Sequence, residues 1–457
     1  MIGTMRLQEI QEVTGGILSG GDAEFSAVSI DTRMLQENEL FIAIKGPNFN
    51  GNRFVGKAEE QHACGAIVSE AVVCGIPTLH VADTRDALGK IGALNRDRTS
   101  ACVIALTGSQ GKTTVKEMTA SILACCGEVV MTRGNLNNDL GVPLSLLKIE
   151  QHHEFAVIEM GANGPGEIAY SVSLTRPQIG HITCIAGTHL EGFGDLAGVA
   201  RAKSEIWQGI REGGTAVVNL DDGFAGQFIK QLEQQAGGRR IVTVSAKGNT
   251  SANVYATAVK LDAIRGAAFT LNAASGTIDV SLGVPGFHNV GNALAAATMA
   301  MAAGAGLDAV KTGLERFTPV KGRMCIVDGM QQATIIDDSY NASPSSFKAA
   351  IDVLVLNAGT TIVVMGDMGE LGTDAERGHR EVGRYARDRG VDHFIAVGNL
   401  SRLAVEEYGD GGIFLDDQAQ FVATILPLLN ASATVLVKGS RSQGMEKLVK
   451  QIQAEAA

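Results

Sequence analysis

The sequence predicts an α/β protein of three domains, and three observations carry that prediction. The chain has 457 residues, enough for about three domains at roughly 150 residues each. From Ala101 onward, apolar runs of about six residues alternate with segments of helical period, which is the pattern of parallel strands joined by helices. Glycine is abundant, at 56 of 457 residues or about 12% against a usual ~7%, so we expect many tight turns.

The first domain is expected at residues 1–98, as a small α/β unit. It contains short strand-like runs separated by Gly and Asn turns, with one helix over 54–62. The runs are AVSIDTR, LFIAIKG, GAIVSE and PTLHVAD.

The second domain is expected at 99–318, on a parallel sheet. Each apolar run ends at a polar or Gly-rich turn and is followed by a helical segment. These runs are ACVIAL, FAVIEM, IGHITCIA, TAVVNL and IVTVSA. Between 252 and 284 the alternation has period two, which predicts antiparallel strands attached to that sheet before a helix near Asn289.

The third domain is expected at 319–457, as a doubly wound, Rossmann-like sheet. Apolar runs and helical segments alternate again, from ATIIDD to the amphipathic end MEKLVKQIQ. Polar clusters follow three of its runs, at 337–341, 366–368 and 438–441. Ligands of such sheets lie at the carboxyl ends of the strands, so these clusters mark a candidate site.

Composition excludes several classes of protein. The 38 basic and 49 acidic side chains give a formal charge of −11 without a Lys/Arg-rich tract, which argues against sequence-independent binding to nucleic acid or anionic membranes. The longest uncharged, Ala-rich stretch, 293–307, is shorter than the ~20 residues of a membrane span, and no signal-peptide pattern opens the sequence. We expect a cytoplasmic protein with small-molecule substrates, no nucleic-acid partner and no membrane span, and we expect it to be a monomer.

The seven cysteines point in the same direction. Their number is odd, none forms a C-x-x-C pair, and several lie inside apolar runs. We therefore expect reduced, buried thiols.

The strongest motif is TGSQGKTT at 107–114, between a strand and a helix. Gly108 and Gly111 would let backbone N–H groups approach phosphate oxygens, Lys112 would neutralise the terminal phosphates, and the Thr113 hydroxyl would bind magnesium. ATP is the expected ligand, and a chance Gly-Lys-Thr turn is the alternative. The general phosphate-loop pattern has Gly where this chain has Leu106, so the motif is a shorter form.

Of four further candidate sites, three have two readings from the residues alone and one has a single reading. Glu159 ends the strand FAVIEM and is either a magnesium ligand or a solvated carboxylate. His189, just beyond IGHITCIA, is either a second metal ligand or an ordinary surface histidine. Lys203 has only the reading of a solvent-facing lysine paired with Glu205 or Glu191. The loop with Asn137 and Asn138 either holds a substrate or caps the next helix.

Taken together, the motifs of this chain resemble those of the Mur ligases, ATP-dependent enzymes of peptidoglycan precursor synthesis. The matching strings follow in the family's order over nearly the whole chain: TGSQGKTT, VIEMGA, THLEGFG, RAKSEI, VPGFHNVGNALAA, KGR, DDSYNASPSS, GDMGELG and VLVKGSRSQGME. DDSYNASP and GDMGELG discriminate most, and they favour the branch that joins D-alanyl-D-alanine to UDP-N-acetylmuramoyl-tripeptide. The resemblance implies an N-terminal domain for the UDP-sugar, a central ATPase domain and a C-terminal domain for the amine substrate.

The resemblance also implies a reaction. ATP would phosphorylate the terminal carboxylate of the peptide, and the amine of D-alanyl-D-alanine would then attack the acyl phosphate. The alternatives are a sister ligase that adds a diamino acid or adds glutamate to folate, and a nucleotide-binding regulator without catalysis. Without the resemblance, a kinase or a GTPase would also compete, although the N-K-x-D string of GTPases is absent.

Residue roles carried over from the family concern metal ions and catalysis first. Thr113 and Glu159 resemble ligands of one Mg²⁺, and His189 a ligand of a second. Lys203 matches the family lysine that reacts with carbon dioxide to form a carbamate, which requires a neutral amine. The implied catalytic set is Lys112, Glu159, His189, Lys203 and Arg323.

The substrate contacts are carried over in the same way. The implied ATP-binding residues are Gly108, Ser109, Gly111, Lys112, Thr113, Thr114, His288, Asn289, Asn292, Arg323 and Asp338. Helix capping is the alternative reading of Asn289 and Asn292. The implied UDP-sugar contacts are Ser29, Asp31, Arg33, Lys45, Asn50, Asn52, Asn137, Asn138 and Thr188. The implied amine-substrate contacts are Tyr340, Asn341 and Ser345, and the family normally has Asn where this chain has Ser343.

Overall fold

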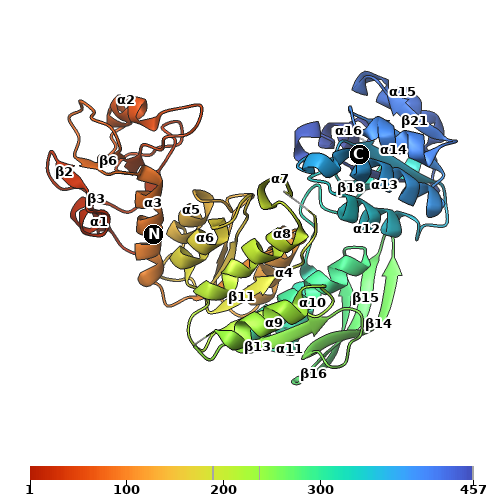
Figure 1. Cartoon of the computed structure of the whole chain (residues 1–457), viewed down its shortest axis with the longest axis horizontal. Helices are drawn as coiled ribbons and strands as arrows, with labels where there is room; N and C mark the ends of the chain where they lie inside the picture. Colours follow the sequence, from red (N-terminus) through yellow and green to blue (C-terminus); the bar gives the residue numbers. More distant parts are fainter. Residues whose placement is uncertain (188–189, 236, 455–457) are drawn as a thin grey trace.

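The computed structural model describes residues 1–187, 190–235 and 237–454. Three lobes follow one another along the long axis, in chain order (Figure 1). The predicted boundary after residue 98 falls between helix α3 (Thr84–Asp97) and strand β8 (Cys102–Thr107). The predicted boundary after residue 318 falls between α11 (Leu307–Arg316) and β17 (Cys325–Asp328).

The N-terminal lobe has a five-stranded sheet in the order β2-β7-β6-β5-β4, parallel except for the β2/β7 pair. Its strands are β2 (Ile17–Ser19), β4 (Val28–Ser29), β5 (Leu40–Ile42), β6 (Gly65–Val68) and β7 (Thr78–His80), beside the antiparallel pair of β1 (Met5–Arg6) and β3 (Glu24–Phe25). The helices are α1 (Leu7–Thr14), η1 (Gly51–Phe54), α2 (Val55–Glu60) and α3.

The expectation of a single helix in this lobe is therefore wrong. Helix α3 has a complete local signal that we overlooked: the Asp83 side chain caps it by accepting a hydrogen bond from Arg85 N at 2.7 Å, and Ala87, Leu88 and Ile91 form its buried stripe.

The middle lobe is built on a nine-stranded sheet in the order β16-β15-β14-β13-β12-β11-β8-β10-β9. The paired strands from β9 to β14 are all parallel. The β14/β15 and β15/β16 pairs are antiparallel, which confirms the predicted antiparallel extension. The remaining strands of this sheet are β9 (Val129–Met131), β10 (Phe155–Glu159), β11 (Ile179–Ile182), β12 (Thr215–Asn219), β13 (Arg240–Ser245), β14 (Val254–Asp262), β15 (Gly266–Ala273) and β16 (Gly276–Leu282).

Helices cover both faces of that sheet. Apolar residues of β8 alternate between the two faces: Ile104 and Leu106 pack toward α4 and α10, whereas Val103 and Ala105 pack on the opposite side. The helices of this lobe are α4 (Lys112–Leu123), α5 (Gly141–Leu147), α6 (Glu167–Thr175), α7 (Leu190–Phe193), α8 (Leu196–Ser204), η2 (Glu205–Gly209), α9 (Ala225–Gln234), α10 (Phe287–Ala302) and α11.

The C-terminal lobe has a six-stranded sheet in the order β17-β18-β22-β19-β20-β21, with β17 as an antiparallel edge. Its other strands are β18 (Thr334–Asp338), β19 (Thr361–Gly366), β20 (His393–Val397), β21 (Gly412–Leu415) and β22 (Thr434–Lys438). Its helices are η3 (Met330–Gln332), α12 (Pro344–Leu354), η4 (Gly372–Asp374), α13 (Ala375–Asp388), α14 (Ser401–Tyr408), η5 (Gln418–Gln420), α15 (Phe421–Ile425), η6 (Leu426–Leu428), η7 (Arg441–Gln443) and α16 (Glu446–Ile452). The doubly wound, parallel arrangement predicted for this region is confirmed.

Two expectations from composition can be compared with the structure. Within the described residues, no helix is both long enough and apolar enough to cross a membrane. All seven cysteines are free, but none is fully buried, and Cys125 and Cys126 are exposed just after the end of α4. The expectation of buried thiols is therefore wrong.

Candidate active site

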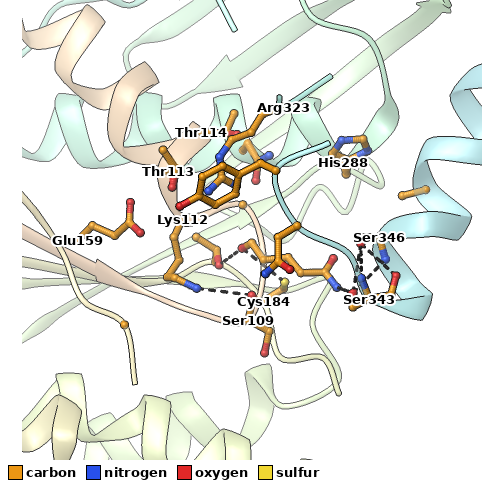
Figure 2. A pocket seen from close by; sticks show the side chains of 18 of the residues that line it. Ser109, Lys112, Thr113, Thr114, Glu159, Cys184, His288, Arg323, Ser343 and Ser346 are labelled. Carbon is orange, nitrogen blue, oxygen red and sulfur yellow. Dashed lines mark hydrogen bonds between the residues drawn. The ribbon is translucent and has the colours of Figure 1, made fainter. Parts of the chain in front are cut away.

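A cavity of about 490 Å³ lies between the middle and C-terminal lobes. The carboxyl ends of β8, β10 and β11 meet those of β18 and β22 around it. In Figure 2 the side chains of Lys112, Glu159 and Arg323 surround the same space. The predicted site residues that line it are Ser109, Gly111, Lys112, Thr113, Thr114, Asn137, Asn138, Glu159, His288, Asn289, Asn292, Arg323, Asp338, Tyr340 and Asn341.

The glycine loop after β8 has the geometry of a phosphate cradle. Gly108 and Gly111 have φ values of +142° and +77°, which side chains rarely adopt. A Cβ atom on Gly108 would lie 2.0 Å from Thr183 Oγ1, so both space and backbone require glycine. Lys112 opens helix α4 and its Nζ folds back to donate to Gly108 O at 2.8 Å. Desolvation lowers the pKa of Lys112, and the Glu159 carboxylate opposes that shift.

Glu159 is a buried carboxylate with spare bonding capacity. Its side chain is at the end of β10, and the residue is 2% exposed. Oε1 accepts a hydrogen bond from Asn137 Nδ2 at 2.8 Å, whereas Oε2 is buried without a partner. A buried carboxylate oxygen left unpaired is costly unless a cation compensates it. The predicted position beside the phosphate turn is confirmed, and the reading of Glu159 as a solvated carboxylate is wrong.

Lys203 is buried rather than solvent-facing, contrary to the reading from the residues alone. It is 1% exposed on α8, where Nζ donates to Ala162 O at 3.3 Å and lies 5.4 Å from the centre of the Phe193 ring. Desolvation lowers the pKa of Lys203 to about 7, and the Lys112 charge acts in the same direction. A substantial fraction of the amine is thus neutral at pH 7, and that fraction increases as the pH rises.

The first two turns of α10 carry amide side chains, and that of Asn292 lies against the glycine loop. The N-cap of this helix is Gly286, so neither Asn289 nor Asn292 is the N-cap residue. Asn289 Nδ2 donates to Pro285 O at 2.7 Å, and Asn292 Nδ2 donates to Asn289 Oδ1 at 2.9 Å. Asn292 Oδ1 is so close to Gly111 that a Cβ there would approach it to 2.6 Å.

The C-terminal lobe contributes two cations, Arg323 and Lys438, and two carboxylates, Asp338 and Glu370, to the cavity. The Arg323 guanidinium lies over the Tyr340 ring at 4.2 Å from its centre, and Arg323 Nε is buried without a partner. Lys438 Nζ donates to Asp338 Oδ2 at 2.5 Å and to Asn341 O at 2.9 Å. The buried Lys438 was not assigned a role from the sequence, although the polar cluster that contains it was noted.

Ser345 does not line the cavity, unlike Tyr340 and Asn341. Its hydroxyl accepts a hydrogen bond from Gln110 Nε2 at 2.6 Å, and the same nitrogen donates to Ser343 Oγ at 2.7 Å. Ser343 is the N-cap of α12, and Figure 2 shows its bonds to Ser346.

The predicted UDP-sugar residues fall in two places. Asn137 and Asn138 line the cavity, whereas Ser29, Asp31, Arg33, Lys45, Asn50 and Asn52 belong to the N-terminal lobe and do not. Arg33 hydrogen-bonds Asp31 and thereby lowers the pKa of Asp31 to about 2. Lys45 forms an ion pair with Glu70 at 2.9 Å.

Two predicted residues, Thr188 and His189, lie outside the described residues. In the part of the chain that the structure describes, no group of three His, Cys, Asp or Glu side chains is placed to hold a metal ion. Thr113 and Glu159 are the described members of the predicted metal set that line the cavity, and Lys203 is not among its lining residues.

His181 is a cavity residue that the sequence reasoning missed. It lies in β11, is 1% exposed, and hydrogen-bonds Val217 O through Nδ1 at 2.9 Å, while Nε2 is buried without a partner. Desolvation lowers the pKa of His181 to about 4. The signal was present, since a histidine interrupts the apolar run IGHITC. Other polar cavity residues that were not predicted include Gln110, Asn163, Glu167, Asn219, Asp221, Lys247 and Glu370.

This arrangement suits a polyphosphate with an associated cation. The N-terminus of α4, Lys112 and Arg323 present positive charge from two lobes. The Glu159 carboxylate, which has an unpaired oxygen, presents negative charge near Lys112.

Comparisons with known proteins agree with this geometry. Residues 106–300 match the Mur ligase middle domain, and residues 322–441 match the Mur ligase glutamate ligase domain. The UDP-N-acetylmuramoyl-tripeptide--D-alanyl-D-alanine ligase of Escherichia coli K12 is 42% identical over 453 residues, 98% of each chain. The enzyme of the same name from Haemophilus influenzae is 38% identical, again over 98% of each chain.

The fold comparison gives the same result. A crystal structure of MurF from Acinetobacter baumannii superposes with a TM-score of 0.92 at 36% identity, covering 98% of this chain and 99% of that one. Similarity of this extent in sequence and fold leaves one assignment: the chain belongs to the Mur ligase family.

Proposed function

We propose that this protein is an ATP-dependent ligase that joins D-alanyl-D-alanine to UDP-N-acetylmuramoyl-tripeptide, releasing ADP and phosphate. The observation that carries the proposal is the shared cavity, where the glycine loop with Lys112 faces Arg323 and Tyr340 of another lobe. The relatives that match over nearly their whole length carry the name of this activity. The proposal includes that the protein acts as a monomer.

The chemistry has two steps. A carboxylate is a poor acyl donor, so an oxygen of the tripeptide carboxylate first attacks the γ-phosphorus of ATP, and the bond to the β–γ bridging oxygen breaks. The amine of D-alanyl-D-alanine then attacks the carbonyl carbon of the acyl phosphate, loses a proton, and displaces phosphate. Lys112 and Arg323 stabilise the charge on the transferring phosphoryl group from opposite sides.

The nucleotide would lie along the glycine loop and α10. Backbone N–H groups of Gly108 and Gly111 and the α4 terminus with Thr114 would bind the phosphates. The Ser109 N–H donates to Cys184 O at 2.9 Å, so Ser109 would support the shape of the loop. His288, Asn289 and Asn292 would contact the base and ribose. Asp338, held by Lys438, would reach the nucleotide from the C-terminal lobe.

Magnesium fits the donors that the structure provides. Thr113 and Glu159 would hold it, because a hydroxyl and a buried, half-satisfied carboxylate are hard oxygen ligands. Bound Mg²⁺ would spread the negative charge of the triphosphate. His189 remains a predicted ligand of a second ion.

Lys203 fits the carbamate role because of its burial. Its neutral amine would attack carbon dioxide, form the N–C bond, and lose one proton, which leaves an anionic carbamate. That anion would interact with the Lys112 charge and also with the carboxylates of Glu167 and Glu205. It would supply an anionic group toward the second ion.

The remaining substrates would occupy the ends of the cavity. Tyr340 and Asn341 would receive D-alanyl-D-alanine, and Asn137 and Asn138 would hold the peptide end of the UDP-linked substrate. The residues of the N-terminal lobe, from Ser29 to Asn52, would bind the uridine end.

The proposed reaction is tested by measuring phosphate release from ATP. Release should require both UDP-N-acetylmuramoyl-tripeptide and D-alanyl-D-alanine, and a pentapeptide-bearing nucleotide should form in equal amount. Release with the dipeptide precursor and a diamino acid, but not with D-alanyl-D-alanine, would instead identify the sister ligase. Release without any acceptor would favour a nucleotide-binding regulator.

The carbamate is tested by its dependence on carbon dioxide. Removing carbon dioxide from the buffers should lower the activity, and added bicarbonate should restore it. Lys203→Ala should reduce kcat by at least about 100-fold, since it removes the anionic group proposed to support the second magnesium ion. Full activity of that variant at saturating Mg²⁺ and bicarbonate would refute the role, and Lys247→Ala is a matched lysine control on the rim of the cavity.

A further inference from the structure

We propose that Gln110 and Ser345 form an interdomain positioning pair that holds the C-terminal lobe against the phosphate-binding loop. Ser345 then acts through the position of the lobe rather than by touching the amine substrate. The inference rests on the proposed function only for its kinetic readout, because the contact itself is a property of the free protein.

The contact joins segments 233 and 235 residues apart in the chain. Gln110 Nε2 donates to Ser345 Oγ at 2.6 Å and to Ser343 Oγ at 2.7 Å. The backbone of Gln110 is itself fixed, because its carbonyl accepts a hydrogen bond from Thr183 Oγ1 at 2.5 Å. The Gln110 side chain therefore leaves a rigid loop and reaches across to α12.

The two serines differ in what else they do. Ser343 is buried and caps α12 in a capping box with Ser346. Ser345 is exposed and takes no part in that capping box. Among the described residues, its hydroxyl hydrogen-bonds Gln110 and, at 3.5 Å, Ser343 Oγ. A serine at this position is thus not needed to start the helix, and its hydroxyl is free to serve the contact between lobes.

The position of the pair matters for the site. The segment just before α12 carries Asp338, Tyr340 and Asn341, which line the cavity opposite Lys112. A bond from the phosphate loop to the first turn of α12 fixes the distance between these groups and the loop. When the lobes separate, bonds to water replace these neutral hydrogen bonds, so the net stabilisation from the pair is small. We expect the pair to shift the equilibrium between joined and separated lobes by about three- to tenfold.

The experiment is a double-mutant cycle with Gln110→Ala and Ser345→Ala in the full chain. Each single variant should lower kcat/KM for D-alanyl-D-alanine by about three- to tenfold, and the double variant should be no worse than the poorer single one. Small-angle X-ray scattering without ligands should show an increased radius of gyration for both single variants and for the double variant. The melting temperature of each variant should be unchanged. Ser345→Thr keeps the hydroxyl and should retain wild-type behaviour.

Ser346→Ala is the matched control. It lies in the same turn and donates to Ser343 O, with no contact to Gln110. It should lower the melting temperature without changing the scattering profile. Additive losses in the double variant, or an unchanged radius of gyration in Gln110→Ala, would overturn the proposal. If the wild-type protein lacked ligase activity, the proposed function would be wrong. The scattering measurements would still test the interdomain contact, because they do not depend on catalysis.

Discussion

At the scale of single residues, the site contains buried polar atoms without a hydrogen-bond partner. Leaving such atoms unpaired costs free energy. Glu159 keeps an unpaired oxygen, Arg323 an unpaired Nε and His181 an unpaired Nε2, and all three line the same cavity. Such orphans are rare in folded proteins, and three of the ten among the described residues line this one cavity, where bound ligands would complete them.

His181 makes a prediction about acid stability. Its folded pKa of about 4 lies below the unfolded value of 6.5, so the unfolded state binds the extra proton between these values and stability falls as the pH drops from about 6.5 to 4. The loss should be on the order of 3 kcal/mol. His181→Leu should flatten this part of the curve of unfolding free energy against pH, measured by urea denaturation. His80→Leu, at an exposed histidine, should leave the slope unchanged; equal slopes in wild type and His181→Leu would contradict the assignment.

At the scale of elements, the unit from β8 to α4 is the most local part of the site. Strand, turn and helix are contiguous, so the residues that form the cradle also determine its shape. Helix α12 is comparable, because its N-cap Ser343 and following Pro344 form a complete start signal.

Gly108→Ala tests the geometry of that turn. The substitution places a Cβ 2.0 Å from Thr183 Oγ1 and imposes an unfavourable φ, so we expect a loss of stability of about 2 kcal/mol or more. ATP affinity, measured by calorimetry, should fall at least about tenfold because the loop must move. Gly134→Ala is the control, since that glycine also has positive φ but nothing within 4 Å, and it should cost only about 1 kcal/mol. Equal ATP affinity of wild type and Gly108→Ala would show that the loop does not bind phosphate.

At the scale of the whole molecule, catalysis depends on two lobes meeting. The cavity needs Lys112 from the middle lobe and Arg323 from the C-terminal lobe, whereas the predicted uridine contacts lie in the N-terminal lobe at the opposite end (Figure 1). Closing the lobes also excludes water from an acyl phosphate that would otherwise hydrolyse.

Arg323→Ala should separate chemistry from binding. We expect kcat to fall at least about 100-fold, because a cation aimed at the transferring phosphoryl group is lost. The affinity for UDP-N-acetylmuramoyl-tripeptide, measured by calorimetry, should change little. Arg441→Ala is the control, because Arg441 also lies over Tyr340, at 5.6 Å, but does not line the cavity. A parallel loss of affinity and kcat in Arg323→Ala would mean that Arg323 binds the UDP-linked substrate.

Much of the fold and part of the site could be predicted from patterns within short windows. The parallel strands of the middle and C-terminal lobes, the antiparallel extension at 252–284 and the glycine loop all follow from local periodicity and turn residues. Short edge strands such as β9, β17 and β21 were not identified, because three or four residues give too little periodicity. The burial of Lys203 was misjudged, since its neighbours Ala162 and Phe193 come from other elements.

The sequence by itself determined the α/β class, the phosphate cradle and the family, because each depends on residues that are adjacent in the chain. Only the tertiary structure decided that Lys203 is desolvated, that Glu159 keeps an open oxygen and that Ser345 bonds to Gln110. The physical reason is that burial and hydrogen bonding depend on which distant segments pack together, and periodicity within one segment does not specify its neighbours.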